Sequence, residues 1–236
     1  MSHPTRPLLL GLALVSLASL FVGCSGPRDI TVRVSVPDLE GRVVPASGVP
    51  VIAVPYNRDS VIRALEAAQS LPRPHTRVLD SLFARFRGPF IDHFRASQHL
   101  AAVRDSVEQG ALGPEALAPA TARTDSTRAA LEAVRADLAA ADSLRTDVRS
   151  WENSTYTSFD SVVKALADQA GRRPEADTTD ALGIAEIRLP ASNNEWWITA
   201  RSWDVTDPNN AWTWNVLVEG DSISLDPTNG IRRPRY

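Results

Sequence analysis

Cysteine and lysine are nearly absent from this sequence. Cys24 is the only cysteine and Lys164 the only lysine among 236 residues. A single cysteine excludes an internal disulfide, so packing must stabilise the folded chain. Arginine carries nearly all of the positive charge, the formal net charge is −3, and no large basic patch occurs. We therefore expect no nucleic acid as a partner.

Motifs of the common enzyme and metal-site classes are missing as well. No Gly-x-Ser-x-Gly elbow, phosphate loop or dinucleotide fingerprint occurs. His93 and His99 are six positions apart, which is not the four-residue spacing that places two zinc ligands on one helix face. We therefore expect no catalytic residue, no metal and no cofactor.

Long apolar runs are missing except at the start. Arg6 makes the first residues positive, and residues 7–22 are almost wholly apolar. This run is shorter than the roughly 20 residues that a helix needs to cross a bilayer. A positive start, a short apolar stretch and small residues before a cleavage point are typical of a secretory signal. The segment therefore predicts export from the cytoplasm.

The end of this segment, Phe21-Val22-Gly23-Cys24, resembles the lipobox of bacterial lipoproteins, although Leu is usual at the position of Phe21. The resemblance implies a signal peptide over residues 1–23 and acylation of Cys24, with membrane lipid as a partner. Because Ser25 follows Cys24, it also implies the outer membrane of a Gram-negative cell envelope. The alternatives are an ordinary signal peptide cut nearby and an uncleaved anchor.

A β pattern follows a short tether over residues 24–29. Residues 30–57 form the first β part, because apolar side chains alternate with polar ones as in a half-buried strand. The face predicted to be buried consists of Ile30, Val32, Val34 and Val36. A second strand is predicted over residues 51–54.

The β pattern returns in residues 177–230, which form the second β part. The predicted strands cover residues 183–189, 195–205, 211–218 and 221–225. We expect residues 231–236 to be a loosely ordered tail.

Between the two β parts, residues 58–172 show helical periodicity. Asn57 or Asp59 is the predicted N-cap, and Pro72 and Pro74 must end the first helix. The later helices are predicted over 75–109, with a kink at Gly88-Pro89, and over 123–170, with a loop over 110–122 between them. Apolar residues recur every three or four positions in 123–170, which favours an antiparallel helical hairpin with arms of nearly equal length. A folded three-helix bundle is the alternative, and the apolar stripe is equally compatible with self-association.

The two β parts resemble transthyretin-like domains of the carboxypeptidase regulatory-like group. The motifs are Asp38-Leu-Glu-Gly41 before Val49-Pro-Val-Ile-Ala-Val-Pro55, and Thr178-Thr-Asp-Ala-Leu-Gly183 before an alternating strand. That family usually has Asp or Asn at the position of Leu182. The resemblance implies a small β-sandwich with a binding or spacer role. The predicted fold class is thus α+β: a small antiparallel β-sandwich with a long inserted helical hairpin or three-helix bundle.

Two sets of residues are candidates for binding. Alternation in the strand places Trp197, Arg201 and Trp203 on one face, which is suited to a glycan or another ligand. We favour the alternative that this face packs under the helical insertion, with Arg201 covering an indole. Leu112 and Leu117 in the predicted hairpin tip are candidates for contact with an envelope protein; a solvated loop is the alternative.

The resulting functional hypothesis is a non-catalytic envelope lipoprotein that acts as a binding or scaffolding module. One alternative is a ligand-binding lipoprotein that uses the tryptophan-rich strand face. Another is a component of a transport assembly, similar in outline to periplasmic adaptor proteins of efflux pumps.

Overall fold

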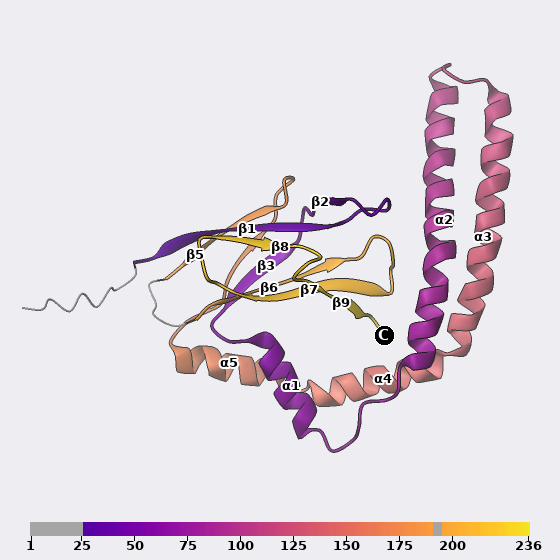
Figure 1. Ribbon diagram of the computed structural model, residues 1–236. Coiled ribbons are helices and arrows are strands. Elements are labelled where there is room, and N and C mark those ends of the chain that lie inside the picture. Colours follow the sequence, from indigo (N-terminus) through magenta and orange to yellow (C-terminus); the bar gives the residue numbers. More distant parts are fainter. Residues whose placement is uncertain (1–25, 191–194) are drawn as a thin grey trace, which may run out of the picture.

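The protein is an α+β molecule in which a β-sandwich carries a helical insertion (Figure 1). The structure is a computed structural model that describes residues 26–190 and 195–236. The predicted signal peptide over 1–23 and the predicted lipidation site Cys24 lie outside the described residues. Within those residues, no helix is both long and apolar enough to cross a membrane.

Two sheets form the sandwich. The first has the order β2-β1-β5, with β8 also paired to β1, and the second has the order β4-β3-β6-β7-β9. The strands are β1 (Arg28–Pro37), β2 (Val43–Pro45), β3 (Pro50–Val54), β4 (Glu175–Thr178), β5 (Ile184–Leu189), β6 (Trp197–Trp203), β7 (Asn210–Leu217), β8 (Ser222–Leu225) and β9 (Ile231–Pro234). Their pairings are antiparallel, apart from the parallel pair of β1 and β8.

One hydrophobic core lies between the sheets. The alternation predicted in β1 is confirmed, because its buried face consists of Ile30, Val32, Val34 and Val36. From the second sheet, Ile198 of β6 and Trp214 of β7 join the same cluster. The indole Nε1 of Trp214 donates a hydrogen bond to the carbonyl oxygen of Asp226 at 2.9 Å, so this buried donor is satisfied.

The chain leaves the sandwich for the helical insertion and returns to it at two neighbouring strands. It begins after β3 and ends before β4, and these two strands are paired, with Ala53 opposite Glu175. The insertion therefore replaces a connection between neighbouring strands and leaves the sheet register intact.

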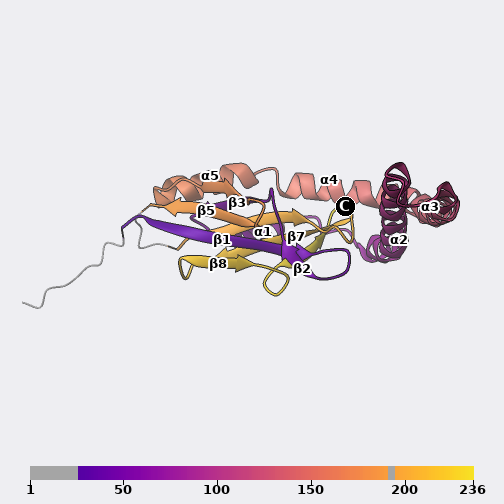
Figure 2. The same cartoon turned by 90° about the horizontal axis from the view of Figure 1, so that it is seen from above.

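The insertion contains a long hairpin and a set of shorter helices. Its elements are α1 (Arg58–Ala68), α2 (Arg77–Glu108), the 3-10 helix η1 (Pro114–Ala116), α3 (Leu117–Ala140), α4 (Asp142–Thr155) and α5 (Phe159–Ala170). Helices α2 and α3 pair as the hairpin, and at 1.5 Å per residue the 32 residues of α2 span about 48 Å. The hairpin stands across one end of the sandwich, whereas α1, α4 and α5 lie along its side (Figures 1 and 2).

The apolar stripe of α3 is used inside the hairpin. Leu131 and Leu138 pack against Phe83 and Phe86 of α2, and all four are buried. A second cluster nearer the tip consists of Leu100, Val103 and Ala120. The α3 part of the stripe that the sequence offers for self-association therefore lies against α2.

The prediction of one helix over 123–170 is wrong, and so is the prediction of two nearly equal arms. The helix ends at Ala140 and again at Thr155, although neither Gly nor Pro is present there. The cause is tertiary packing: Trp151 of α4 is buried, and its Nε1 donates to the carbonyl oxygen of Leu71 at 2.9 Å. This contact holds α4 against the connection between α1 and α2.

Other helix boundaries also differ from the sequence pattern. The predicted break at Pro72 and Pro74 is confirmed, and the N-cap is Asn57, whose Oδ1 accepts from the amide of Ser60 at 3.1 Å. Helix α2 continues through Pro89. The expected loop over 110–122 is shorter, because η1 and the first turns of α3 occupy residues 114–122.

Residues 231–236 are not a loosely ordered tail. Residues 231–234 form β9, which pairs with β7 at the edge of the second sheet. The carbonyl of Tyr236 accepts from Arg149 at 2.9 Å, and its ring stacks on Phe83, 5.9 Å between centroids. This segment therefore joins the sandwich to the insertion.

Candidate functional site

A wide groove lies between the outer face of the second sheet and the helices along its side. Its volume is about 1230 Å³, and its walls come from β3, β6, β7 and β9 on one side and from α1, α4 and α5 on the other. Its lining contains seven arginines: Arg58, Arg73, Arg145, Arg149, Arg201, Arg233 and Arg235. We call it the arginine groove. Only three acidic residues line it, Glu66, Glu152 and Asp160, so a protein of net negative charge has a cationic groove.

The helix wall of the groove is fixed to the sheet at the start of α1. The Oδ1 of Asn57, which caps α1, also accepts from Nδ2 of Asn215 in β7 at 2.8 Å. Arg58 is the first residue of α1, and its guanidinium lies over the ring of Phe159 in α5, 5.6 Å from the centroid. The cap therefore fixes Arg58 in the lining of the groove.

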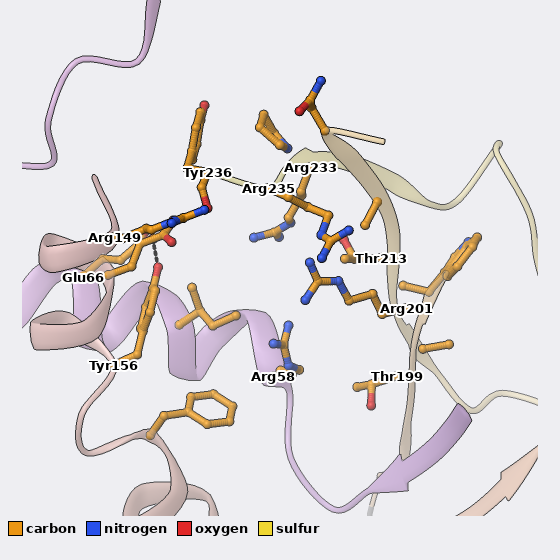
Figure 3. A pocket seen from close by; sticks show the side chains of 18 of the residues that line it. Arg58, Glu66, Arg149, Tyr156, Thr199, Arg201, Thr213, Arg233, Arg235 and Tyr236 are labelled. Atoms are coloured by element: carbon orange, nitrogen blue, oxygen red, sulfur yellow. Dashed lines mark hydrogen bonds between the residues drawn. The ribbon is translucent and has the colours of Figure 1, made fainter. Parts of the chain in front are cut away.

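The sheet wall supplies arginines from two strands and the residue after β9. Arg201 lies in β6, Arg233 in β9, and Arg235 follows β9. Because side chains alternate along an extended chain, Arg233 and Arg235 are on the same side. Arg233 is paired with Asp59 of α1 at 3.2 Å. Figure 3 shows the side chains of Arg58, Arg201, Arg233 and Arg235 pointing toward one another across the groove.

Four of these arginines have no carboxylate partner among the described residues: Arg58, Arg149, Arg201 and Arg235. Arg149 donates instead to the carbonyl oxygen of Tyr236, which leaves Arg58, Arg201 and Arg235. Burial lowers the pKa of Arg58, and the positive charges of Arg233 and Arg201 lower it further against the opposing effect of Asp59. Burial and the charge of Arg201 also lower the pKa of Arg235. The guanidinium group of Arg201 is thus close enough to repel those of both Arg58 and Arg235.

Two of the three acidic side chains of the groove have partners. Glu66 accepts a hydrogen bond from the phenol of Tyr156 at 2.6 Å (Figure 3). Burial, and then this hydrogen bond, raises the pKa of Tyr156. Glu152 is 3.5 Å from Arg73, and burial raises the pKa of Glu152. Glu66 and Glu152 belong to the helix wall, and the positive charge of Arg201 is close enough to lower the pKa of Glu152 against the larger effect of burial.

Three polar side-chain atoms in the lining are buried and have no hydrogen-bond partner: Nε of Arg145, Nδ2 of Asn209 and Nε of Arg233. All three are donors. Buried donors are nearly always satisfied in proteins, by the chain itself or by a bound molecule. The groove therefore has hydrogen-bond donors that lack an acceptor, which agrees with its positive charge.

A loop beside the groove anchors the hairpin. Asp204 and Asp207 are almost wholly buried, and both form ion pairs with Arg232 of β9, the second at 3.2 Å. The hydroxyl of Thr206 in the same loop accepts from Arg87 of α2 at 3.1 Å. This loop therefore links β9, β6 and the base of the hairpin.

The structure brings two of the three predicted strand-face residues together. Arg201 and Trp203 line a small pocket of about 170 Å³ with Arg235. It is Arg235 whose guanidinium covers the Trp203 ring, at 3.4 Å from the centroid. Trp197 is half-buried in β6 and lines neither this pocket nor the arginine groove.

The two predicted tip residues differ in exposure. Leu112 is 44% exposed in the turn between α2 and η1. Leu117 is half-buried, because it is the first residue of α3 and packs against the cluster of Leu100, Val103 and Ala120. Leu112 is therefore the more accessible of the two.

The arginine groove is a site that the sequence pattern did not reveal. Of its lining, only Arg201 was a candidate, since the arginines are distributed from position 58 to position 235. The one local signal is the spacing of Arg233 and Arg235, which places two arginines on one side of an extended segment.

Among the described residues, no group of three or more His, Cys, Asp or Glu side chains is arranged to hold a metal ion. No protein-family model matches the chain, and neither the curated proteins nor the solved structures give a significant match.

Proposed function

We propose that this protein is a non-catalytic lipoprotein of the cell envelope, anchored through acylated Cys24, which presents its helical hairpin to a partner protein. One observation carries the proposal. The described chain begins β1 at Arg28, at the end of the sandwich opposite to the hairpin (Figure 1). The sandwich would therefore act as a spacer between the membrane and the hairpin.

The attachment of the hairpin supports a scaffolding role. Its base is joined to the sandwich by the bond of Arg87 to Thr206, and Arg95 donates to the carbonyl oxygen of Leu39 at 2.7 Å. The tip beyond these contacts extends past the sandwich (Figure 1). A hairpin held at its base and free at its tip keeps the tip at a set distance from the anchor.

Photo-crosslinking in the native cell tests the scaffolding role. A probe at Leu112 in the tip should capture one defined envelope protein, whereas a probe at Leu182, a leucine of the sandwich that is more exposed than Leu112, should not. Capture of the same proteins from both positions, or none from Leu112, would contradict the proposal.

The anchor has a separate test. Metabolic labelling with a fatty acid should mark the protein, and Cys24→Ser should abolish the label and release the protein from the membrane fraction. Retention of the unlabelled variant in the membrane would instead indicate an uncleaved apolar anchor.

A second candidate function is binding of a glycan on the tryptophan-rich strand face. The exposure of Trp203, 61% of its surface, favours it. However, Arg235 already covers one face of this indole. A sugar ring would have to displace that arginine, so we place the scaffolding role first.

A further inference from the structure

We propose that the arginine groove binds an organic phosphate, with the phosphoryl oxygens held by Arg58, Arg201 and Arg235 and the carbon body lying along the helix wall. This site is independent of the hairpin tip and of the scaffolding role. It lies between the second sheet and helices α1, α4 and α5, and no residue of α2, η1 or α3 lines it.

The first argument is the arrangement of unpaired charge. Three guanidinium groups converge from α1, β6 and the residue after β9, and none has a carboxylate partner among the described residues (Figure 3). Like charges that approach one another are unfavourable unless an anion lies between them. Elsewhere in the described chain, arginines commonly pair with carboxylates, as Arg42 does with Asp38 at 2.7 Å.

The second argument concerns the shape of the anion. One planar carboxylate is satisfied by the fork of a single arginine. Three arginines that approach from three different elements can instead contact oxygens that point in different directions. A tetrahedral phosphoryl group presents oxygens in this way, and guanidinium groups recognise phosphate strongly.

The third argument is the remainder of the lining. Beside the cationic centre lie the apolar side chains Ile62 and Phe159 on the helix wall, and the orphan donor Nδ2 of Asn209 on the sheet side. A volume of about 1230 Å³ far exceeds what inorganic phosphate fills. A phosphate attached to a carbon framework would use both the charged and the apolar parts.

This chemistry has two possible sources, a soluble phosphorylated metabolite and a phospholipid headgroup. Calorimetric titration of the purified protein with inorganic phosphate, glucose 6-phosphate and citrate tests the first. Flotation with phosphatidylglycerol vesicles, with phosphatidylcholine vesicles as the comparison, tests the second, and is done with the Cys24→Ser variant so that the anchor does not contribute.

The matched variants are Arg201→Gln in the groove and Arg104→Gln on the exposed surface of α2, which remove the same charge. Loss of one charge-assisted contact should weaken phosphate binding about tenfold or more in Arg201→Gln. Arg104→Gln should bind as the unaltered protein does. Glucose 6-phosphate binding would indicate a soluble ligand, and selective flotation with phosphatidylglycerol that is lost in Arg201→Gln would indicate a headgroup.

Thermal unfolding separates lost binding from misfolding. Because Arg201 is repelled by its neighbours, Arg201→Gln should unfold without ligand at the same temperature as the unaltered protein or higher. The phosphate ligand should raise the unfolding temperature of the unaltered protein and not that of Arg201→Gln. The proposal fails if no phosphate probe binds, if Arg201→Gln and Arg104→Gln bind equally, or if citrate binds more tightly than every phosphate.

Discussion

Arg235 lies directly over the indole of Trp203, with its guanidinium carbon 3.4 Å from the ring centroid. This contact joins the residue after the last strand to the end of β6. It also fixes the direction of Arg235, so that one side chain both covers the tryptophan and lines the arginine groove.

Removal of this cover should be visible by fluorescence. Arg235→Gln should make Trp203 more accessible to acrylamide, with a loss of stability of about 1 kcal/mol or less, as for a cation–π contact at an exposed site. Arg188→Gln, an exposed position of β5 on the other sheet, is the control. The same comparison is repeated in a Trp203→Phe background. If Arg235→Gln still increases acrylamide quenching there, the signal comes from another tryptophan and this assignment is wrong.

The buried carboxylate of Asp204 should be essential for stability. Its side chain is 2% exposed and pairs with Arg232. Asp204→Asn removes a buried charge-assisted contact, and Arg232 keeps its pair with Asp207, so we expect a cost of about 1–3 kcal/mol. Urea denaturation measures this loss. Asp221→Asn is the control, because Asp221 is largely exposed and 3.8 Å from Arg28, and its loss should change stability by less than about 1 kcal/mol. Similar midpoints for both variants would contradict the prediction.

Alanine substitutions at two glycines distinguish the cost of a left-handed backbone from the cost of a steric clash. Gly48 and Gly183 have φ of 71° and 72°, but only at Gly183 would an added Cβ lie 2.6 Å from the carbonyl oxygen of Val34. Gly48→Ala should cost about 1–2 kcal/mol from the left-handed backbone alone. Gly183→Ala should cost about 1–3 kcal/mol more, because β1 must move. Equal free energies of unfolding would show that β1 does not constrain this turn.

Leu131 should hold the hairpin closed. It is 2% exposed between α2 and α3, so Leu131→Ala is expected to cost about 2–5 kcal/mol locally. Amide hydrogen exchange should become faster in α2 and α3 while β1 keeps its protection. Leu112→Ala at the tip is the control and should change neither. Faster exchange throughout the sandwich would show that the hairpin and sandwich unfold as one unit.

We expect the stability of the folded protein to fall at alkaline pH as the phenol of Tyr236 ionises. Burial, and then a 2.6 Å hydrogen bond to Asp80, raises the pKa of Tyr236 from 10.0 to about 12. A raised pKa means that this stabilisation is complete below about pH 10 and is lost as the pH rises through about 12. Tyr236→Phe should remove this part of the pH dependence of unfolding. An unchanged profile would show that the hydrogen bond does not contribute.

The parts of the fold that were predicted correctly depend on local patterns. The alternation at Ile30, Val32, Val34 and Val36 marks one buried face of a strand, and Asn57 has the side chain that an N-cap requires. In β6, the alternation that places Trp197, Arg201 and Trp203 on one face leaves Ile198 and Ala200 on the other, and both are in the core. In each case, the sequence neighbours alone determine the structure.

The parts that were predicted wrongly depend on distant contacts. The break after Ala140 has no local signal and results from the packing of Trp151 against the connection between α1 and α2. The strand 231–234 contains two arginines and a proline, which do not favour a strand, and it forms because β7 offers an edge. The arginine groove has the same origin, because Arg58 and Arg235 meet only after the sandwich has formed.

The insertion begins and ends at paired neighbouring strands, and this gives the molecule a modular architecture. Since Ala53 already lies opposite Glu175, a turn of a few residues could close the second sheet in place of the whole helical segment. A shorter protein of that design would keep every strand of the sandwich. It would lose the hairpin and one wall of the arginine groove at once, so the chain acquires both features, or neither, through a single insertion.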